Sequence, residues 1–123
     1  MNKRERKELE GWIRETLLEA RKKLFLDKYD DPIIETMKQG NYLEIVCNYP
    51  YLDYIVRYSP AAEEDYKIRR PYLRKALYHE MCHLVLAPMK MLVERPKKVA
   101  REELIDINEH TTDHIRRIVM QHG

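Results

Sequence analysis

The sequence predicts a small α+β domain in which one long helix precedes a short β-sheet and two further helices follow it. Apolar residues recur at steps of three and four near the N-terminus and again in the second half, which is typical of amphipathic helices. Between them, residues 42–58 are rich in β-branched and aromatic side chains. With 123 residues, 44% hydrophobic and 36% charged, the chain has the size and balance of one folded unit. We therefore expect residues 1–123 to form a single domain.

Composition also excludes several classes of protein. Lys and Arg number 23 against 21 Asp and Glu, and this net charge of +2 argues against a nucleic-acid partner for the chain as a whole. No stretch is long and apolar enough to predict a membrane span or a secretory leader. Cys47 and Cys82 form no CxxC pair, which argues against a disulfide framework. We expect a cytoplasmic protein, and the composition specifies no oligomeric state.

The first element is a helix over residues 3–28. Its apolar residues lie on one face, and charged residues occupy the other. Gly11 interrupts this pattern at a cost of up to about 1 kcal/mol relative to Ala, so the helix either begins near Gly11 or tolerates it. The residues expected to face the core are Leu9, Trp12, Ile13, Thr16, Leu17, Ala20 and Leu24.

The next segment carries a helix signal followed by strand signals. Asp30, Asp31 and Pro32 resemble a helix cap with Pro at the first helical position, so Ile33–Lys38 is predicted as a short helix that stops at Gly40. Residues 42–47 and 52–58 are predicted as two strands joined by a short loop, and a third strand elsewhere stays an open alternative. Residues 60–65 are predicted as an acidic connection.

Two helices are predicted in the second half. One begins at Pro71 and is interrupted by Pro88, and a short piece over residues 89–95 follows it. The last helix spans about residues 98–121. The residues predicted to face inward from it are Leu104, Ile107, Thr111, Ile115, Ile118 and Val119.

The helix that begins at Pro71 contains the motif HExxH, formed by His79, Glu80 and His83. Residues four apart on a helix lie one above the other, so both imidazoles can bind one metal ion at Zn–N distances of about 2.0 to 2.1 Å. Glu80 is rotated by about 100° from His79 around the helix axis, which puts its carboxylate beside the metal, where a general base belongs. The alternative is a pair of ordinary helix histidines.

A catalytic zinc ion usually takes three protein ligands and a water molecule, so a third ligand is needed from another element. Glu109 in the last helix can supply it, and Glu102, Glu103 and Asp106 on nearby turns are the alternatives. Asp113 lies four residues after Glu109, on the same helix face, and can accept the second N–H of a zinc-bound imidazole. That partner favours Glu109 as the third ligand.

These two segments resemble the pattern of the gluzincin metallopeptidases, HExxH followed on a later helix by NExx(S/T)D. The resemblance implies that His79, His83 and Glu109 are zinc ligands, that Glu80 is the catalytic base and that Asp113 is the partner of His79. Over residues 42–120 the chain also looks like the small zincin-like metallopeptidases of bacteriophages and prophages. The likeness implies a minimal zincin-like domain with an N-terminal helix, a small β-sheet, an HExxH helix and a C-terminal glutamate helix, in a bacterial host cell.

The chemistry implied is hydrolysis of peptide bonds in a peptide or protein substrate by metal-activated water, with Glu80 taking and returning the proton. No downstream histidine matches the one that steadies the oxyanion in the gluzincins. The side chains open as a second oxyanion donor are His110, His114, Tyr54, Tyr58 and Tyr78. An extended substrate could add itself to an exposed strand edge beside the zinc helix.

Two other functions are compatible with the same residues. One is a regulatory protease that cleaves a phage repressor or a DNA-bound protein. The other is a non-enzymatic, zinc-stabilised interaction module in which the metal only joins two helices. Structural zinc sites normally close with four protein ligands, often cysteines, and the three ligands evident here favour an enzyme.

Overall fold

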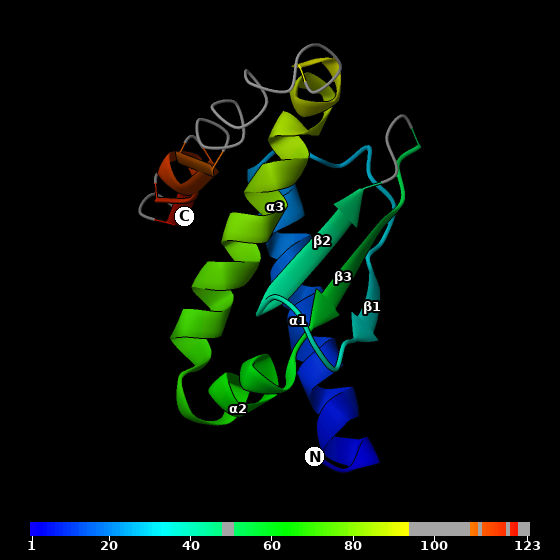
Figure 1. The fold of residues 1–123 in the computed structure, drawn as a ribbon, viewed down its shortest axis with the longest axis vertical. Coiled ribbons are helices and arrows are strands. Elements are labelled where there is room, and N and C mark those ends of the chain that lie inside the picture. The colour runs from blue at the N-terminus through cyan, green and yellow to red at the C-terminus, as the bar shows by residue number, and fades with distance from the viewer. Residues whose placement is uncertain (48–50, 94–108, 111, 118, 121–123) are drawn as a thin grey trace.

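A computed structural model describes residues 1–47, 51–93, 109, 110, 112–117, 119 and 120. The protein is an α+β domain with a mixed, three-stranded sheet (Figure 1). Its elements, in chain order, are α1 (Lys3–Lys23), β1 (Ile33–Thr36), β2 (Leu43–Cys47), β3 (Tyr54–Tyr58), α2 (Pro60–Ile68) and α3 (Arg70–Val93). The described residues from Glu109 to Met120 are also helical and are called the C-terminal segment below. No described helix meets the length and apolarity needed to cross a bilayer.

Helix α1 starts and ends on local signals. The Asn2 side chain caps its N-terminus by accepting a hydrogen bond from the backbone N–H of Glu5 at 2.9 Å. The helix ends at Lys23, earlier than predicted, because Phe25 adopts a left-handed backbone with φ of 57°. Gly11 lies inside α1, and a β-carbon there would meet nothing within 4 Å. The helix therefore tolerates Gly11 without a packing reason for it.

The sheet has the order β1-β3-β2, with β1 parallel and β2 antiparallel to β3. The predicted strands over residues 42–47 and 52–58 correspond to β2 and β3. The prediction of a short helix at Ile33–Lys38 was wrong, because Ile33–Thr36 pairs with β3 as the third strand. A pairing with residues more than twenty positions away leaves no signal in the local pattern, whereas the Asp–Pro pair before Ile33 does.

One face of the sheet packs against α1 and α3, and this is where the core lies (Figure 1). Alternate residues of β3, namely Tyr54, Val56 and Tyr58, are at most 1% exposed and point into this core. The side chains that contribute to the core from the helices include Leu9, Ile13 and Leu17 of α1 and Leu73, Leu77, Met81 and Leu84 of α3. The core thus fixes the rotation of α3 and with it the direction of the HExxH side chains.

Two predictions about the helices after the sheet were wrong. Residues 60–68 form α2 rather than an acidic connection, because Ser59 caps the helix and Pro60 occupies its first turn. Helix α3 also continues through Pro88 to Val93. Proline removes the N–H that would bond the carbonyl of Leu84, four residues earlier, and the Tyr29 hydroxyl lies 3.5 Å from that oxygen instead.

The predicted last helix, residues 98–121, lies partly outside the described residues. Four of the six residues predicted to face inward from this helix also lie outside them, namely Leu104, Ile107, Thr111 and Ile118. The same holds for residues 94–95 of the short piece predicted before the helix. In the described C-terminal segment, Thr112 and Arg116 are buried, at 0% and 6% exposure. The predicted Ile115 and Val119 are only partly buried. Among the described residues of this segment, the buried ones are therefore polar, whereas Val119 and Met120 pack against the core while partly exposed.

Candidate metal centre

His79 and His83 project from one face of α3 toward Glu109 in the C-terminal segment. Their rings meet edge to face, with centroids 5.0 Å apart and an interplanar angle of 81°. Nε2 of His79 lies 3.1 Å from Oε2 of Glu109, and Nε2 of His83 lies 3.1 Å from Oε1. One ligand atom from each of the three residues lies within 4.8 Å of the others. The two histidines and the glutamate that the motifs single out thus converge on one point.

This donor set fits a zinc ion. Zinc accepts imidazole nitrogen and carboxylate oxygen, and two ligands about 2.0 to 2.1 Å from a tetrahedral ion lie about 3.3 Å apart. The observed separation of 3.1 Å between each Nε2 and its carboxylate oxygen is close to that spacing. His79 and His83 are part-buried, with side chains 25% and 17% exposed, and Glu109 is 53% exposed. The cluster is therefore reachable from solvent.

The other ring nitrogen of each histidine also has a neighbour in the C-terminal segment. Nδ1 of His79 lies 3.5 Å from Oδ1 of Asp113, and Nδ1 of His83 lies 3.4 Å from the hydroxyl of Thr112. In the tautomer that leaves Nε2 free to bind a cation, the Nδ1–H of His83 donates to the Thr112 hydroxyl, and the Nδ1–H of His79 faces the Asp113 carboxylate as an ion-pair neighbour. The structure brings Asp113 to the histidine that the family pattern pairs it with, and adds Thr112 for the second.

Asp113 is itself held by two guanidinium groups. Nε of Arg116 donates to Oδ1 at 3.0 Å, and Nε of Arg117 lies 3.0 Å from Oδ2. The hydrogen bond from Arg116 is the largest cause that holds the pKa of Asp113 below its usual value. Arg116 is 7% exposed at its side chain, whereas Arg117 is 71% exposed. A buried cation therefore fixes the carboxylate that faces His79.

Thr112 and Arg116 were missed by sequence reasoning, although a signal existed. Residues 109, 112, 113 and 116 follow the three- and four-residue spacing of one helix face. Once Glu109 and Asp113 are placed toward α3, Thr112 and Arg116 must point the same way. The sequence pattern instead favoured the apolar Ile115, because apolar residues are usually the buried ones.

The remaining predicted residues near this cluster differ in how far they are buried. Glu80 follows His79 on α3 and is half-buried. His110 and His114 are exposed on the C-terminal segment. Cys82, between the two histidines, is buried, and burial raises the pKa of its thiol to about 12. Cys82 does not belong to the ligand group that the described residues His79, His83 and Glu109 form.

The three tyrosines named as oxyanion donors are all buried in the core. Tyr54 stacks edge to face with Tyr29, and its hydroxyl has no hydrogen-bond partner in the described chain. Tyr78 lies under the ammonium of Lys23 in α1. These side chains point toward the core elements, and no described contact joins any of them to Glu109.

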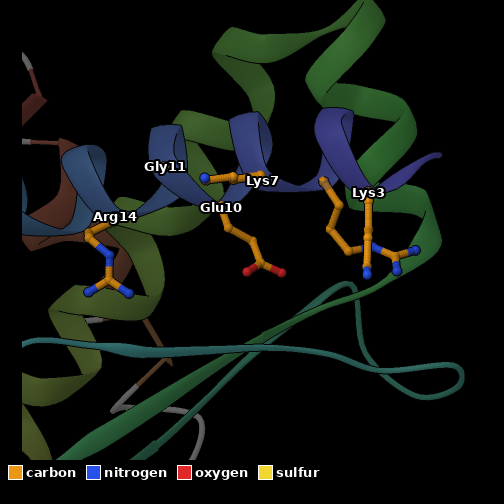
Figure 2. Close-up of a pocket in the computed structure, with 6 residues that line it drawn as sticks. Lys3, Lys7, Glu10, Gly11 and Arg14 are labelled. Atoms are coloured by element: carbon orange, nitrogen blue, oxygen red, sulfur yellow. The ribbon is translucent and has the colours of Figure 1, made fainter.

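The third tyrosine, Tyr58, donates its hydroxyl proton to Glu10 of α1 at 2.6 Å. Glu10 also lines a separate pocket of about 430 Å³ along α1, together with Lys3, Lys7 and Arg14 (Figure 2). Figure 2 shows Glu10 directed from α1 toward the strands. This pocket shares no lining residue with the cluster around Glu109.

Comparison of the chain with models of protein families, with curated proteins and with solved structures gave no match.

Proposed function

We propose that the protein is a zinc-dependent peptidase of the gluzincin type, built on a minimal zincin-like domain, that hydrolyses peptide bonds in a peptide or protein substrate in the cytoplasm of a bacterial host. The observation that supports it is the approach of His79 and His83 to different oxygens of Glu109, both at 3.1 Å. A site built only to hold structure normally closes with four protein ligands, whereas the described chain offers a group of three.

In this proposal His79, His83 and Glu109 hold the ion. A zinc ion bound there lowers the pKa of water from 15.7 toward about 7 and polarises a carbonyl oxygen. Glu80, one position after His79 on α3, accepts the proton of the attacking water and passes it to the leaving nitrogen. Thr112 keeps the ring of His83 in place by accepting from its Nδ1–H, and the charge of Asp113 orients the ring of His79 from 3.5 Å.

The second oxyanion donor is best sought on the C-terminal segment. Tyr54, Tyr58 and Tyr78 are at most 1% exposed and are engaged in the core. His110 and His114 are exposed and belong to the same segment as Glu109. We therefore favour these two histidines over the tyrosines as groups that donate to the developing oxyanion.

The central experiment compares zinc content and hydrolysis of a denatured protein in the parent, Glu80→Gln and Glu109→Ala. Glu80→Gln should keep zinc and lose turnover, because its carboxylate moves protons and is no ligand. Glu109→Ala should lose zinc. Glu64→Gln is the matched control, since Glu64 is exposed on α2 and makes no described contact.

Two results would contradict the proposal in different ways. Full zinc retention by Glu109→Ala would remove Glu109 from the ligand set. If the parent binds zinc, unfolds when the metal is removed and cleaves no substrate, the metal has a structural role only, and the protein is an interaction module rather than a peptidase.

A further inference from the structure

A second, smaller pocket lies directly beside the metal cluster. It has a volume of about 130 Å³ and is lined by residues of α3 and of the C-terminal segment. Its lining residues are Tyr72, Lys75, Ala76, His79, Asp113 and Arg116. Because a water molecule takes up about 30 Å³ of the liquid, the space suits a group of a few heavy atoms. The shared residue His79 joins this pocket to the candidate metal centre.

The inner wall of the pocket carries a guanidinium with donors to spare. Arg116 has five N–H donors, of which Nε bonds Asp113 at 3.0 Å and Nη1 lies 3.8 Å from the sulfur of Met120. No other acceptor for it is found in the described part of the chain. A nearly buried guanidinium with free donors costs desolvation energy unless an acceptor enters from outside.

The rim of the pocket adds a second cation. Lys75 is exposed, lies one helical turn before His79, and makes no ion pair with any described residue. Asp113 is the one carboxylate among the lining residues, and both of its oxygens already face Arg116 and Arg117. Positive charge therefore exceeds negative charge around the pocket, and a neutral or cationic ligand would leave it uncompensated.

We propose that this pocket is a subsite for a carboxylate group of the substrate, bound by Arg116 and Lys75. This inference rests on the proposed peptidase function for its position in the reaction. Lys75 lies one helical turn before His79, about 5.4 Å along α3, and an extended peptide advances about 3.3 Å per residue. The carboxylate therefore belongs to a residue one or two positions from the scissile bond. It is either an Asp or Glu side chain or the C-terminal carboxylate of the peptide.

The test uses two pairs of fluorescent peptides. The first pair carries Glu or Gln at the same position and has an amidated C-terminus. The second pair is neutral in its side chains and ends in a free carboxylate or an amide. Binding is measured by anisotropy on zinc-loaded Glu80→Gln protein, and cleavage is measured on the parent. We expect at least tenfold tighter binding and faster cleavage of the carboxylate member in one pair, and the pair that shows it identifies the source.

Lys75→Glu and Lys7→Glu make the same change of charge in two places. Lys75→Glu should abolish or reverse the preference, whereas Lys7→Glu, on the exposed surface of α1, should retain it. Both substitutions are at exposed lysines, and circular dichroism and zinc content verify that the variants are folded. Equal effects of the two variants would show that the preference reflects overall charge and would overturn the assignment of the pocket.

The outcomes separate this inference from the proposed function. Cleavage that is equal within both pairs overturns the carboxylate subsite and leaves the peptidase in place. A carboxylate preference in binding that depends on Lys75, without cleavage of any peptide, supports the subsite and removes the peptidase. If no peptide binds at millimolar concentration, or if both members of each pair bind equally, the subsite is wrong.

Discussion

Oδ1 of Asp113 lies 3.5 Å from Nδ1 of His79, on the side of the imidazole opposite the nitrogen that approaches Glu109. A carboxylate in this position fixes the tautomer of the ring and strengthens Nε2 as a donor. In the proposed zinc site Asp113 is a positioning residue, since it approaches the side chain of a proposed ligand and not Glu109. Its effect is therefore measurable on the metal alone.

Asp113→Asn should weaken zinc binding by about 10- to 100-fold, because an amide oxygen is a poorer acceptor for the Nδ1–H of His79 than a carboxylate. The measurement is competition with a chromophoric chelator at pH 7. Asp27→Asn serves as control, since Asp27 is exposed and makes no described contact. Unchanged zinc affinity in Asp113→Asn would show that the 3.5 Å approach does not support the ligand.

Replacing Arg116 and Arg117 one at a time should show how burial changes the contribution of an ion pair to the free energy of unfolding. Both lie 3.0 Å from Asp113 through Nε, but their side chains are 7% and 71% exposed. In the metal-free protein, Arg116→Met should lower the free energy of unfolding by roughly 1 to 3 kcal/mol, because it leaves the Asp113 carboxylate without its buried partner. The loss stays below that of a fully buried pair, since Asp113 is 35% exposed. Arg117→Met should cost below about 0.5 kcal/mol. Urea unfolding measures both, and equal losses would contradict the distinction.

Tyr54→Phe should raise the free energy of unfolding by roughly 1 kcal/mol, because the buried hydroxyl has no partner in the described chain. Burial also raises the pKa of Tyr54 to about 12. Tyr58→Phe is the matched control and should destabilise by about 1 kcal/mol, since it removes the 2.6 Å bond to Glu10. Thermal unfolding measures both. If Tyr54→Phe lost hydrolysis at unchanged stability, Tyr54 would belong to the site after all.

Asp65 should make stability depend on pH in the acid range. Its carboxylate accepts from Arg69 at 3.1 and 3.2 Å and from the Tyr42 hydroxyl at 2.7 Å, and these bonds lower its pKa from 3.8. A lowered carboxyl pKa contributes stability above pH of about 3.8, and that contribution is lost as pH falls through the folded-state pKa. The difference in unfolding free energy between the parent and Asp65→Asn should therefore shrink below pH 4. A constant difference from pH 7 to pH 2 would contradict this.

The parts of the fold that follow local rules were predictable from the sequence. The rotation of α3 follows from the spacing of its apolar residues, and the positions of His79 and His83 follow from that rotation. The choice of Glu109 over three neighbouring acids rested on its partner Asp113 four residues later, because helix periodicity alone did not distinguish it from them. The pairing of β1 was not predictable, since the register of Ile33 with Ile55 depends on contacts between distant segments.

Pro88 shows why a local rule failed within α3. The rule that proline ends a helix rests on the lost N–H and on crowding of the preceding turn. In this protein the Leu84 carbonyl, which the loss would leave without a partner, faces the hydroxyl of Tyr29 from a distant part of the chain. Tertiary contacts of this kind cannot be read from the residues adjacent to the proline.

The order of contacts between the two helices has a consequence for the chain as a whole. Both histidines reach Glu109, whereas Tyr72 and Ala76, which precede them on α3, line a pocket with Arg116, which follows Glu109. Helix α3 and the C-terminal segment therefore run in opposite directions. A cation bound between the two helices would link the ends of the chain segment that connects them. Release of the cation and detachment of the C-terminal segment from α3 are therefore coupled equilibria. Chelators should therefore speed proteolytic trimming at this end of the polypeptide before they affect its sheet.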